Sequence, residues 1–496
     1  MRDVGRDTAN IRRDLIWRQS DLADRAGVAH QVARYALAFE PGDLPGAVVH
    51  QARRCILDAL GCAIGALDAP GRPIIEGAVL EAGGLPEATV IGSGQRTSAM
   101  NAALVNSFLV RFLDFNDLGG GGHNSDALAS LLAVAEKENR TGADLVTALV
   151  VSYELGARFG ESVTSRPVGV PISASLEQKG WTKDIRGGLN QPPAIGRLMG
   201  LTEDQIANAV GICLSHALPL GILDGHRDEA TMAKNIRFGW VAHDAILACL
   251  LARRGFTGPL RIVESEVGVR NVVTGGEMDV DRLTNFSGWR ILDTRFKALA
   301  LNATTHAHVL ATLGIVIDEN LRPEDIAAVR IRAPVREVRH TTAPPKQYPR
   351  NAESADHSAF FANAIAIRDR SVGPEAIVPS NFTDPVVLRL IEQITVEPDP
   401  ALGYYQGTSE ILTTDGRRFS RRVDQPHGLG DDPLTDAELE MKFRSLVAGR
   451  LSARRVDDLV AACWRIDELD DLSELTRLLV VDRIGSPAGA PGSRDR

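Results

Sequence analysis

Residues 48–67, VVHQARRCILDALGCAIGAL, carry apolar side chains at three- and four-residue spacing, as Ala52, Ile56 and Leu60 show. That spacing places the apolar side chains on one face of a helix. Similar patterns continue from about residue 28 to residue 275, and they are rich in Ala and Gly, whereas aromatic residues make up only 5% of the chain. Because small side chains let helices approach closely, the pattern predicts a compact bundle of many helices.

Several of these helices have a recognisable start. Thr141 is followed three residues later by Asp144, and Thr202 is followed by Gln205, each just before an apolar run. This spacing is typical of a capping box, in which the two side chains bind the free amide groups of the first turn. We therefore expect helices to begin directly after the two threonines.

The pattern changes near residue 276, where strand signals begin to alternate with helical ones. Residues 326–331 alternate apolar and polar side chains, and residues 394–396 are a β-branched run. Residues 409–416 end in an Asp-Gly turn that is typical of a hairpin. Helical spacing returns at Thr435. These patterns predict a mostly α protein in which a smaller α+β domain is inserted into a large all-helical domain.

The domain boundaries are placed where the pattern changes. The first residues are charged and weakly periodic, and the last ones are rich in Gly, Pro, Ser and Arg. The predicted segments are an N-terminal extension at residues 1–27, an all-helical domain at 28–275 and 433–483, an α+β domain at 276–432, and a disordered tail at 484–496.

Composition excludes several classes of protein. The 496 residues include 44% hydrophobic and 24% charged side chains, which suits a folded core, and the net charge is −9. Without a long basic run the chain is a poor binder of nucleic acid or anionic membranes. No apolar stretch approaches the length of a membrane span, and the first 25 residues lack the apolar core of a secretory signal.

The cysteines point to a reducing compartment. There are five, an odd number, and no two form C-x-x-C, so we expect neither a disulfide framework nor a cysteine-only zinc or iron–sulfur site. A cytoplasmic location with reduced thiols follows. The five are Cys55, Cys62, Cys213, Cys249 and Cys463.

The richest polar cluster is residues 114–126, DFNDLGGGGHNSD, which lies between two apolar helical patterns. Its four glycines form a loop whose backbone can approach a ligand closely. An imidazole and carboxylates in such a loop can supply a base and the group that orients it. The structural alternative is that Asn124 or Ser125 simply caps the following helix. The candidate side chains are Asp114, Asp117, His123 and Asp126.

Cationic residues occur in three further segments. Trp181-Thr182-Lys183 precedes a helical pattern expected at residues 192–199, Lys234 begins a long apolar helix, and Lys297 is followed by His306. Lysines from separate segments suit an anionic substrate, because cations hold carboxylates and stabilise the charge left when a proton leaves the adjacent carbon. The alternative for both Lys234 and Lys297 is a side chain that reaches solvent. No spacing indicates a metal site.

The clusters, in this order, resemble the MmgE/PrpD family, which includes 2-methylcitrate dehydratase, cis-aconitate decarboxylase and iminodisuccinate epimerase. The resemblance runs from about residue 28 to residue 481. The segments that carry it are RCILDALGC at 54–62, ATVIG at 88–92, FLDFND at 112–117, HNSD at 123–126, SYEL at 152–155, KGW at 179–181, GRLMGL at 196–201, AKN at 233–235, GFTGP at 255–259, Phe296-Lys297 with Thr305-His306, and ADHS at 355–358.

The resemblance implies a helical domain with an α+β lid, a homodimer, and a site in the cleft between the domains that needs no metal or other cofactor. The substrate is a small anionic carboxylate that loses a proton beside a carboxylate group. The implied catalytic residues are Asp114, His123, Lys234 and Lys297. Asp117, Trp181, Thr182, Lys183 and His306 are expected to bind substrate.

Some positions depart from the family pattern. Asn116 and Leu118 stand where Asp and Thr are usual, Asn124 replaces Pro, and Thr182 replaces a common His. A tyrosine that some members place near residue 338 is not evident there. Since Thr182 cannot act as an acid or base near neutral pH, either His123 serves both proton transfers or the chemistry differs.

Three hypotheses for function follow. The first is a metal-independent lyase that removes a proton next to a carboxylate of a small di- or tricarboxylate, with loss of water or CO2. The second is an epimerase or isomerase that uses the same site. The third is a homologue that binds such an acid but has lost catalysis.

Overall fold

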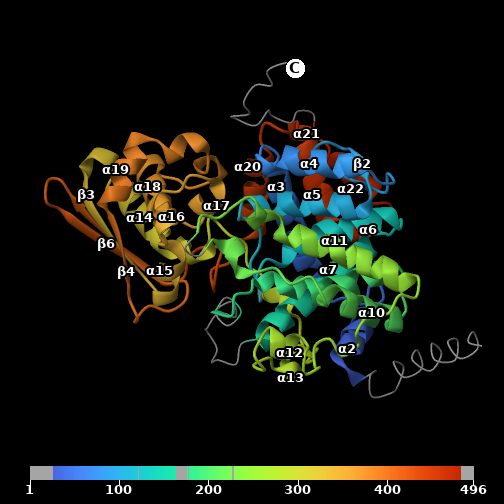
Figure 1. Ribbon diagram of the computed structural model, residues 1–496. Coiled ribbons are helices and arrows are strands. Elements are labelled where there is room, and N and C mark those ends of the chain that lie inside the picture. The colour runs from blue at the N-terminus through green and yellow to red at the C-terminus, as the bar shows by residue number, and fades with distance from the viewer. Residues whose placement is uncertain (1–25, 121, 164–175, 177, 226–227, 482–496) are drawn as a thin grey trace, which may run out of the picture.

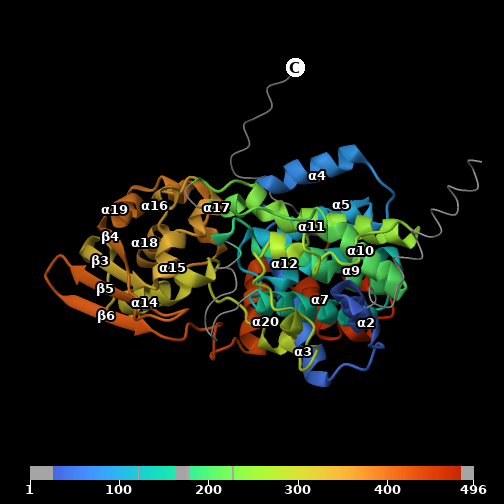
Figure 2. The ribbon, with the colours of Figure 1, turned by 60° about the horizontal axis from the view of Figure 1, so that its bottom comes forward.

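The computed structural model describes residues 26–120, 122–163, 176, 178–225 and 228–481. Nearly all of the predicted N-terminal extension and the predicted disordered tail lie outside these residues. The prediction of a mostly α protein is confirmed. Figures 1 and 2 show two bodies side by side, a larger helical lobe and a smaller lobe that carries the main β-sheet.

The larger lobe is a bundle around one hydrophobic core. The quoted stretch forms α3, which begins at Gly46 and buries Ala52, Ile56 and Leu60 as predicted. The helices of the bundle include α2 (Val28–Leu37), α3 (Gly46–Gly65), α4 (Gly71–Ala82), α5 (Ala99–Phe112), α6 (Leu128–Lys137), α7 (Gly142–Ser162), α9 (Gly187–Leu198), α10 (Glu203–Leu214), α11 (Ala233–Arg253), α20 (Asp436–Val447), α21 (Ala453–Trp464) and the short α22 (Ser473–Leu478).

Small side chains bring the helices of the larger lobe together. A Cβ at Gly239 in α11 would lie 2.9 Å from the carbonyl oxygen of Leu104 in α5, so this contact requires glycine. Thr141 and Thr202 both form the predicted capping boxes. The lobe also contains two short antiparallel strands, β1 (Ala88–Thr89) and β2 (Arg96–Thr97), which the helical pattern did not predict.

One helix boundary differs from its prediction. The helix expected at residues 192–199 is α9, which begins at Gly187 and carries Pro192 and Pro193 in its interior. Proline usually marks a first turn. Here the preceding turn is already buried, since Cβ atoms at Gly187 and Gly188 would clash with α11 and α10, and tertiary packing sets the start of the helix.

The smaller lobe has its own hydrophobic core and a four-stranded sheet in the order β4-β3-β5-β6. The strands β3 (Ile326–Ala333), β4 (Ile394–Pro398), β5 (Gly407–Thr413) and β6 (Arg418–Val423) confirm the predicted alternation and the hairpin, with Gly416 at φ +89° in the turn. β3 pairs parallel with β4 and antiparallel with β5. The helices are α14 (His306–Asp318), α15 (Val335–Thr341), α16 (Pro344–Gln347), α17 (Ala352–Ala355), α18 (Ala359–Asp369) and α19 (Pro385–Gln393).

The chain passes from the larger core to the smaller one near residue 299. Met278, Leu283 and Phe296 pack into the larger core, although the predicted α+β domain begins at residue 276. This stretch includes the short helices α12 (Val269–Val272) and α13 (Val280–Leu283). The chain returns to the larger core at Leu434. Among the described residues, no helix is both long enough and apolar enough to cross a membrane.

Candidate active site

A cavity of about 70 Å³ lies between the two lobes. Both lobes line it, with the loop after α5 and the start of α11 on one side and α15 on the other. Its lining is rich in cations and imidazoles: Arg111, Lys183, Arg237, Lys297 and Arg336, with His123, His340 and His357. Such a surface attracts an anionic ligand.

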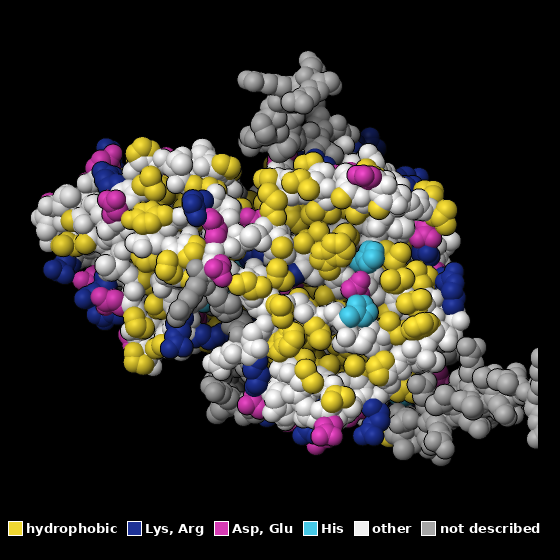
Figure 3. All heavy atoms as spheres, viewed as in Figure 1, with side chains coloured by type: hydrophobic (Ala, Val, Ile, Leu, Met, Phe, Trp, Pro, Cys, Tyr) yellow, Lys and Arg dark blue, Asp and Glu magenta, His cyan; other side chains and the backbone are white. Residues whose placement is uncertain are grey.

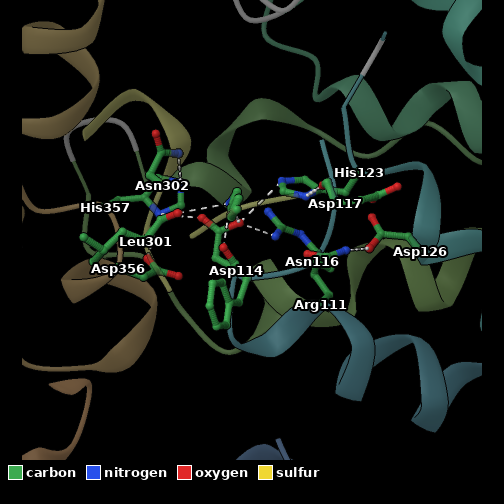
Figure 4. Close-up of polar contacts among 12 residues, drawn as sticks. Arg111, Asp114, Asn116, Asp117, His123, Asp126, Leu301, Asn302, Asp356 and His357 are labelled. Carbon is green, nitrogen blue, oxygen red and sulfur yellow. Dashed lines mark hydrogen bonds and ion pairs between the residues drawn. The ribbon is translucent and has the colours of Figure 1, made fainter. Parts of the chain in front are cut away.

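Asp114 is the carboxylate at the centre of this cluster, and Figure 4 shows it between His123 on one side and Asp356 with His357 on the other. It follows the end of α5 in a left-handed conformation, φ +44°, which turns its side chain back toward Arg111. Although burial raises the pKa of Asp114, Lys297 and Arg111 outweigh burial and hold that pKa well below its ordinary value. Asp114 is therefore a fixed anion.

His123 has a defined tautomer. Its Nδ1 lies 2.7 Å from the carbonyl oxygen of Asp117, which can only accept, so Nδ1 carries the proton and donates it. Burial, followed by the neighbouring cations Arg111 and Lys183, lowers the pKa of His123 well below its ordinary value. The neutral ring therefore has its lone pair at Nε2, 3.4 Å from Asp114 Oδ1 and at the wall of the cavity. This is the arrangement of a general base.

Lys297 secures the same carboxylate from the segment that enters the smaller lobe. Its Nζ donates to the carbonyl oxygens of Asp114 (2.5 Å) and Leu301 (3.1 Å), and it lies 3.0 Å from Asp114 Oδ1. The side chain is 1% exposed, so the alternative of a solvent-directed lysine is wrong. Its positive charge contributes to the wall of the cavity.

Lys234 is also buried, at 1% exposure, and does not reach solvent. Its Nζ donates to both carboxylate oxygens of Asp356, at 2.6 and 2.7 Å, and to the carbonyl oxygen of Glu353. This ion pair joins α11 of the larger lobe to α17 and the following turn in the smaller lobe. Lys234 does not line the cavity itself, and it positions Asp356 beneath His357.

His357 is a cavity residue whose two nitrogens are both engaged. Asn302 Oδ1 accepts from the amide of Thr304, so Asn302 Nδ2 faces His357 Nε2 and donates to it at 2.8 Å. His357 Nδ1 must then carry the proton, which it donates to Asp356 Oδ1 at 2.6 Å. Burial first, and then Lys234, lower the pKa of His357 well below its ordinary value.

Asp114, Asp356 and His357 place one ligand atom each within 4.8 Å of one another, a spacing that suits a metal ion. The charges around them oppose that use. Lys234 Nζ already lies 2.6 Å from Asp356, and Lys297 with Arg111 neutralises Asp114. A divalent cation placed here would face three buried cations. The donor set therefore fits an ammonium group better than a metal.

Lys183 lines the cavity and, among the described residues, its Nζ has no hydrogen-bond or ion-pair partner. Burial and the nearby guanidinium of Arg111 lower its pKa to about 8. By contrast Arg237 is paired with both Asp184 and Asp224. Lys183 is thus the cation most available to a carboxylate of the substrate.

The remaining predicted binding residues lie behind the cavity wall. Asp117 accepts from the hydroxyls of Ser125 and Tyr153, and burial raises its pKa to about 7. Thr182 accepts from the amide of Asp184, as a helix cap does. Trp181 pairs with Leu220 outside the site, and His306 is buried against Leu301 with a pKa lowered to about 3, chiefly by burial. None of these four lines the cavity.

Several cavity residues were not predicted from the sequence. His357 lies in a segment that carried the resemblance, and that resemblance was the signal that could have found it. Arg111 is spaced three residues from Asp114, which favours pairing on a helix. Glu337 and Tyr404 have no local signal, because only the fold of the smaller lobe brings them to the cavity.

The fold and the site define a two-lobed helical protein whose lobes enclose a cavity lined by cations and imidazoles. The chain belongs to the MmgE/PrpD family, since the family's N-terminal domain matches residues 30–281 and its C-terminal domain matches residues 300–466.

Among its relatives, cis-aconitate decarboxylase of Aspergillus terreus is 24% identical, over a match that spans 93% of this chain and 97% of the length of that relative. The human cis-aconitate decarboxylase is 25% identical over 88% of this chain and 91% of its own. The 2-methylcitrate dehydratase of Cupriavidus necator is 24% identical over 58% of this chain and 60% of its own.

Proposed function

We propose that this protein is a lyase that removes a proton beside a carboxylate of a small di- or tricarboxylic acid, with loss of water or CO2. The observation that carries the proposal is the neutral His123, whose Nε2 lone pair meets a cavity lined by cations. The names of the relatives support it, because they describe a decarboxylase and a dehydratase of such acids.

The residues divide the chemistry between them. Lys183 binds a carboxylate of the substrate, and its charge withdraws electrons from the adjacent C–H bond. His123 Nε2 takes the proton from that carbon. Asp114, already a fixed anion, stabilises the imidazolium that forms, while the bond from Nδ1 to the carbonyl oxygen of Asp117 holds the ring in place. Lys297 contributes positive charge near the developing enolate-like anion.

Metal independence belongs to the proposal as well. The three potential ligands Asp114, Asp356 and His357 are neutralised by ammonium and guanidinium groups, which supply the positive charge that a metal would bring. We expect activity to withstand treatment with a chelator. Loss of activity on chelation, with recovery on adding back a divalent metal, would contradict this part.

We also propose that the smaller lobe acts as a lid over the site. The support is a set of bonds that join the lobes beside the cavity. Lys234 pairs with Asp356, and Lys346 of α16 donates to the carbonyl oxygen of Asp224. Release of these contacts would open the cavity to substrate. Small-angle X-ray scattering with and without a bound acid tests this, since closure on binding predicts a smaller radius of gyration.

An epimerase is the second candidate, because the cavity offers titratable side chains from both lobes. His123 lies on the larger lobe, while Glu337 and His340 lie on the smaller one. Proton removal on one face and return on the other would invert the carbon. Exchange of the substrate hydrogen with deuterium from the solvent, with inversion and without loss of water or CO2, would identify this reaction.

A panel of carboxylic acids tests the proposed function. It includes cis-aconitate, 2-methylcitrate and simpler dicarboxylates, each measured by thermal shift and by product analysis. A ligand that binds only the folded protein raises its melting temperature by mass action. Lys183→Met should abolish the shift, whereas Lys179→Met, which removes an exposed lysine paired with Glu277, should keep it. Equal shifts in both variants would contradict the assigned site.

Two further proposals concern the assembly and the compartment. Hydrophobic side chains gather over the face of the larger lobe around α11 (Figure 3), where Trp240 is 52% and Met232 47% exposed. We propose that this face pairs two copies in a homodimer, and Trp240→Glu should then give a monomer in light scattering.

All five cysteines are buried and free, which supports the reducing cytoplasm as the location.

A further inference from the structure

Glu337 is a buried acid on the smaller lobe that the proposed reaction has not yet used. It lies on α15, lines the same cavity as His123, and is 2% exposed. Its Oε1 accepts one long hydrogen bond, 3.4 Å, from the amide of Tyr405, and its Oε2 has no hydrogen-bond partner among the described residues. Within that part of the chain it makes no ion pair.

These surroundings favour the protonated carboxyl. A buried carboxylate without a counter-ion is strongly disfavoured, and burial raises the pKa of Glu337 to about 8. Arg336 precedes it on the same helix, with His340 one turn later, and Tyr405 packs against its carboxyl from the loop before β5. The charged or titratable groups that line the cavity from other elements are Arg111, His123, Lys183, Asp224, Arg237 and Lys297, with His357 and Tyr404.

The histidines of the cavity and Thr182 are poorer proton donors, and Lys183 is assigned to a carboxylate of the substrate. His123 Nδ1 donates to a backbone carbonyl, and His357 donates from Nδ1 while accepting at Nε2. Thr182, which occupies the position of a common family histidine, caps a helical turn outside the cavity. His340 is neutral, because burial and then Lys346 lower its pKa, and a neutral imidazole is a far weaker acid than a carboxylic acid.

We infer that Glu337 is the proton donor of the reaction, placed by the smaller lobe across the cavity from the base His123. The inference rests on the proposed function. It also accounts for Thr182, since a carboxyl on the opposite lobe supplies the second acid–base group that this chain lacks there.

The step balances in protons and electrons. His123 Nε2 takes the proton from the carbon beside the carboxylate, and the C–H electron pair becomes the new C=C bond. The C–O bond then breaks, and the leaving oxygen takes the proton of Glu337, so that water departs and Glu337 becomes a carboxylate. If CO2 leaves instead, no C–H proton is removed: the C–C electron pair stays on the carbon and takes the proton of Glu337, while His123 stays neutral. Solvent then restores the proton on Glu337 and, after loss of water, removes the one from His123.

Glu337→Gln tests the inference, because glutamine keeps the shape but cannot give up a proton near neutral pH. Turnover of an acid from the panel is compared in wild type, Glu337→Gln and Glu397→Gln, a control at an exposed carboxylate on β4. We expect kcat to fall at least about 100-fold in Glu337→Gln, with KM changed less than about threefold, and to stay normal in the control.

The outcomes separate the inference from the function on which it rests. Normal kcat in Glu337→Gln, or a rise in KM alone, would overturn the role of Glu337 while the lyase stands. A wild type that converts no acid would refute the proposed function. Infrared spectroscopy adds a measurement that needs no substrate. At neutral pH the difference spectrum of wild type minus Glu337→Gln should contain the carbonyl band of a protonated carboxyl, and a carboxylate band instead would overturn the inference.

Discussion

The ion pair between Lys234 and Asp356 offers a sharp test of how the two lobes are held together. Its partners are 1% and 3% exposed, and Asp356 lies close to the second buried carboxylate, Asp114. Lys234→Met removes the ammonium and leaves Asp356 without its partner. Breaking a buried pair on one side costs about 3–5 kcal/mol, so we expect a loss of that size in the free energy of unfolding at pH 8.

The same variant predicts a dependence on pH. Burial raises the pKa of Asp356 to about 6 even with Lys234 present, and the lysine acts to lower it. Without Lys234 the pKa rises further, so the folded variant binds a proton more readily than the unfolded chain does. Stability contributed by such a group is present at low pH and is lost as the pH rises through the folded pKa. The destabilisation should therefore be smaller at pH 5.5 than at pH 8.

Urea unfolding followed by tryptophan fluorescence measures both effects. The double variant Lys234→Met with Asp356→Asn removes the charge on each side and should regain roughly half or more of the loss, because a neutral pair avoids an isolated buried charge. Lys179→Met, at a pair that is 31% exposed on the lysine side, should cost at most about 1 kcal/mol. A Lys234→Met loss no larger than this control, or one that grows as the pH falls, would refute the reasoning.

Three further predictions concern Gly122 in the glycine loop, the buried acid Glu337, and the buried ion pair between Lys442 and Asp58. Gly122 has φ +126°, and a Cβ there would lie 2.7 Å from Lys183 Cδ, so Gly122→Ala should raise KM through displacement of Lys183, measured by steady-state kinetics. Glu337→Gln should gain stability relative to wild type between pH 5 and pH 9 in urea titrations, because the raised pKa of Glu337 makes its contribution fall as the pH rises toward about 8. Lys442→Met should lose about 3–5 kcal/mol in the same assay, since Asp58, 0% exposed by its side chain, would lose its partner at 2.7 Å.

The secondary structure was largely predictable because its causes are local. The apolar spacing of α3, the capping threonines and the Asp-Gly turn act over a few residues, and the structure confirms them. Where local propensity and packing disagree, packing decides. The prolines of α9 are an example, because the buried turn before them fixes an earlier helix start.

The site was predictable in part, for the same reason. Asp114 and His123 lie nine residues apart in one loop, so their meeting was open to inference from the sequence. The partner of Lys234 is Asp356, 122 residues later, and no local pattern indicates that pairing. The predicted catalytic role of Lys234 stays a prediction, and in the structure its ammonium group pairs with Asp356. The position of Thr182 follows from a local pattern, because a threonine hydroxyl readily accepts from the amide two residues later and so begins a helical turn, here at Asp184.

Glu337 shows most clearly what the sequence cannot reveal. It occurs as one of many acidic residues in a polar helical segment, and nothing nearby distinguishes it. Its raised pKa arises from burial, which outweighs the neighbouring guanidinium of Arg336 and depends on the packing of the smaller lobe. Properties that depend on desolvation are invisible until the chain is folded.

In the proposed reaction His123 removes a proton from a carboxylic acid held in the cavity. The most direct test is the kcat of His123→Gln on an acid that wild type converts, with the fold checked by its melting temperature. We expect kcat to fall by about 10²–10⁴-fold with the fold intact. A well-folded His123→Gln enzyme that turns over at the wild-type rate would contradict it.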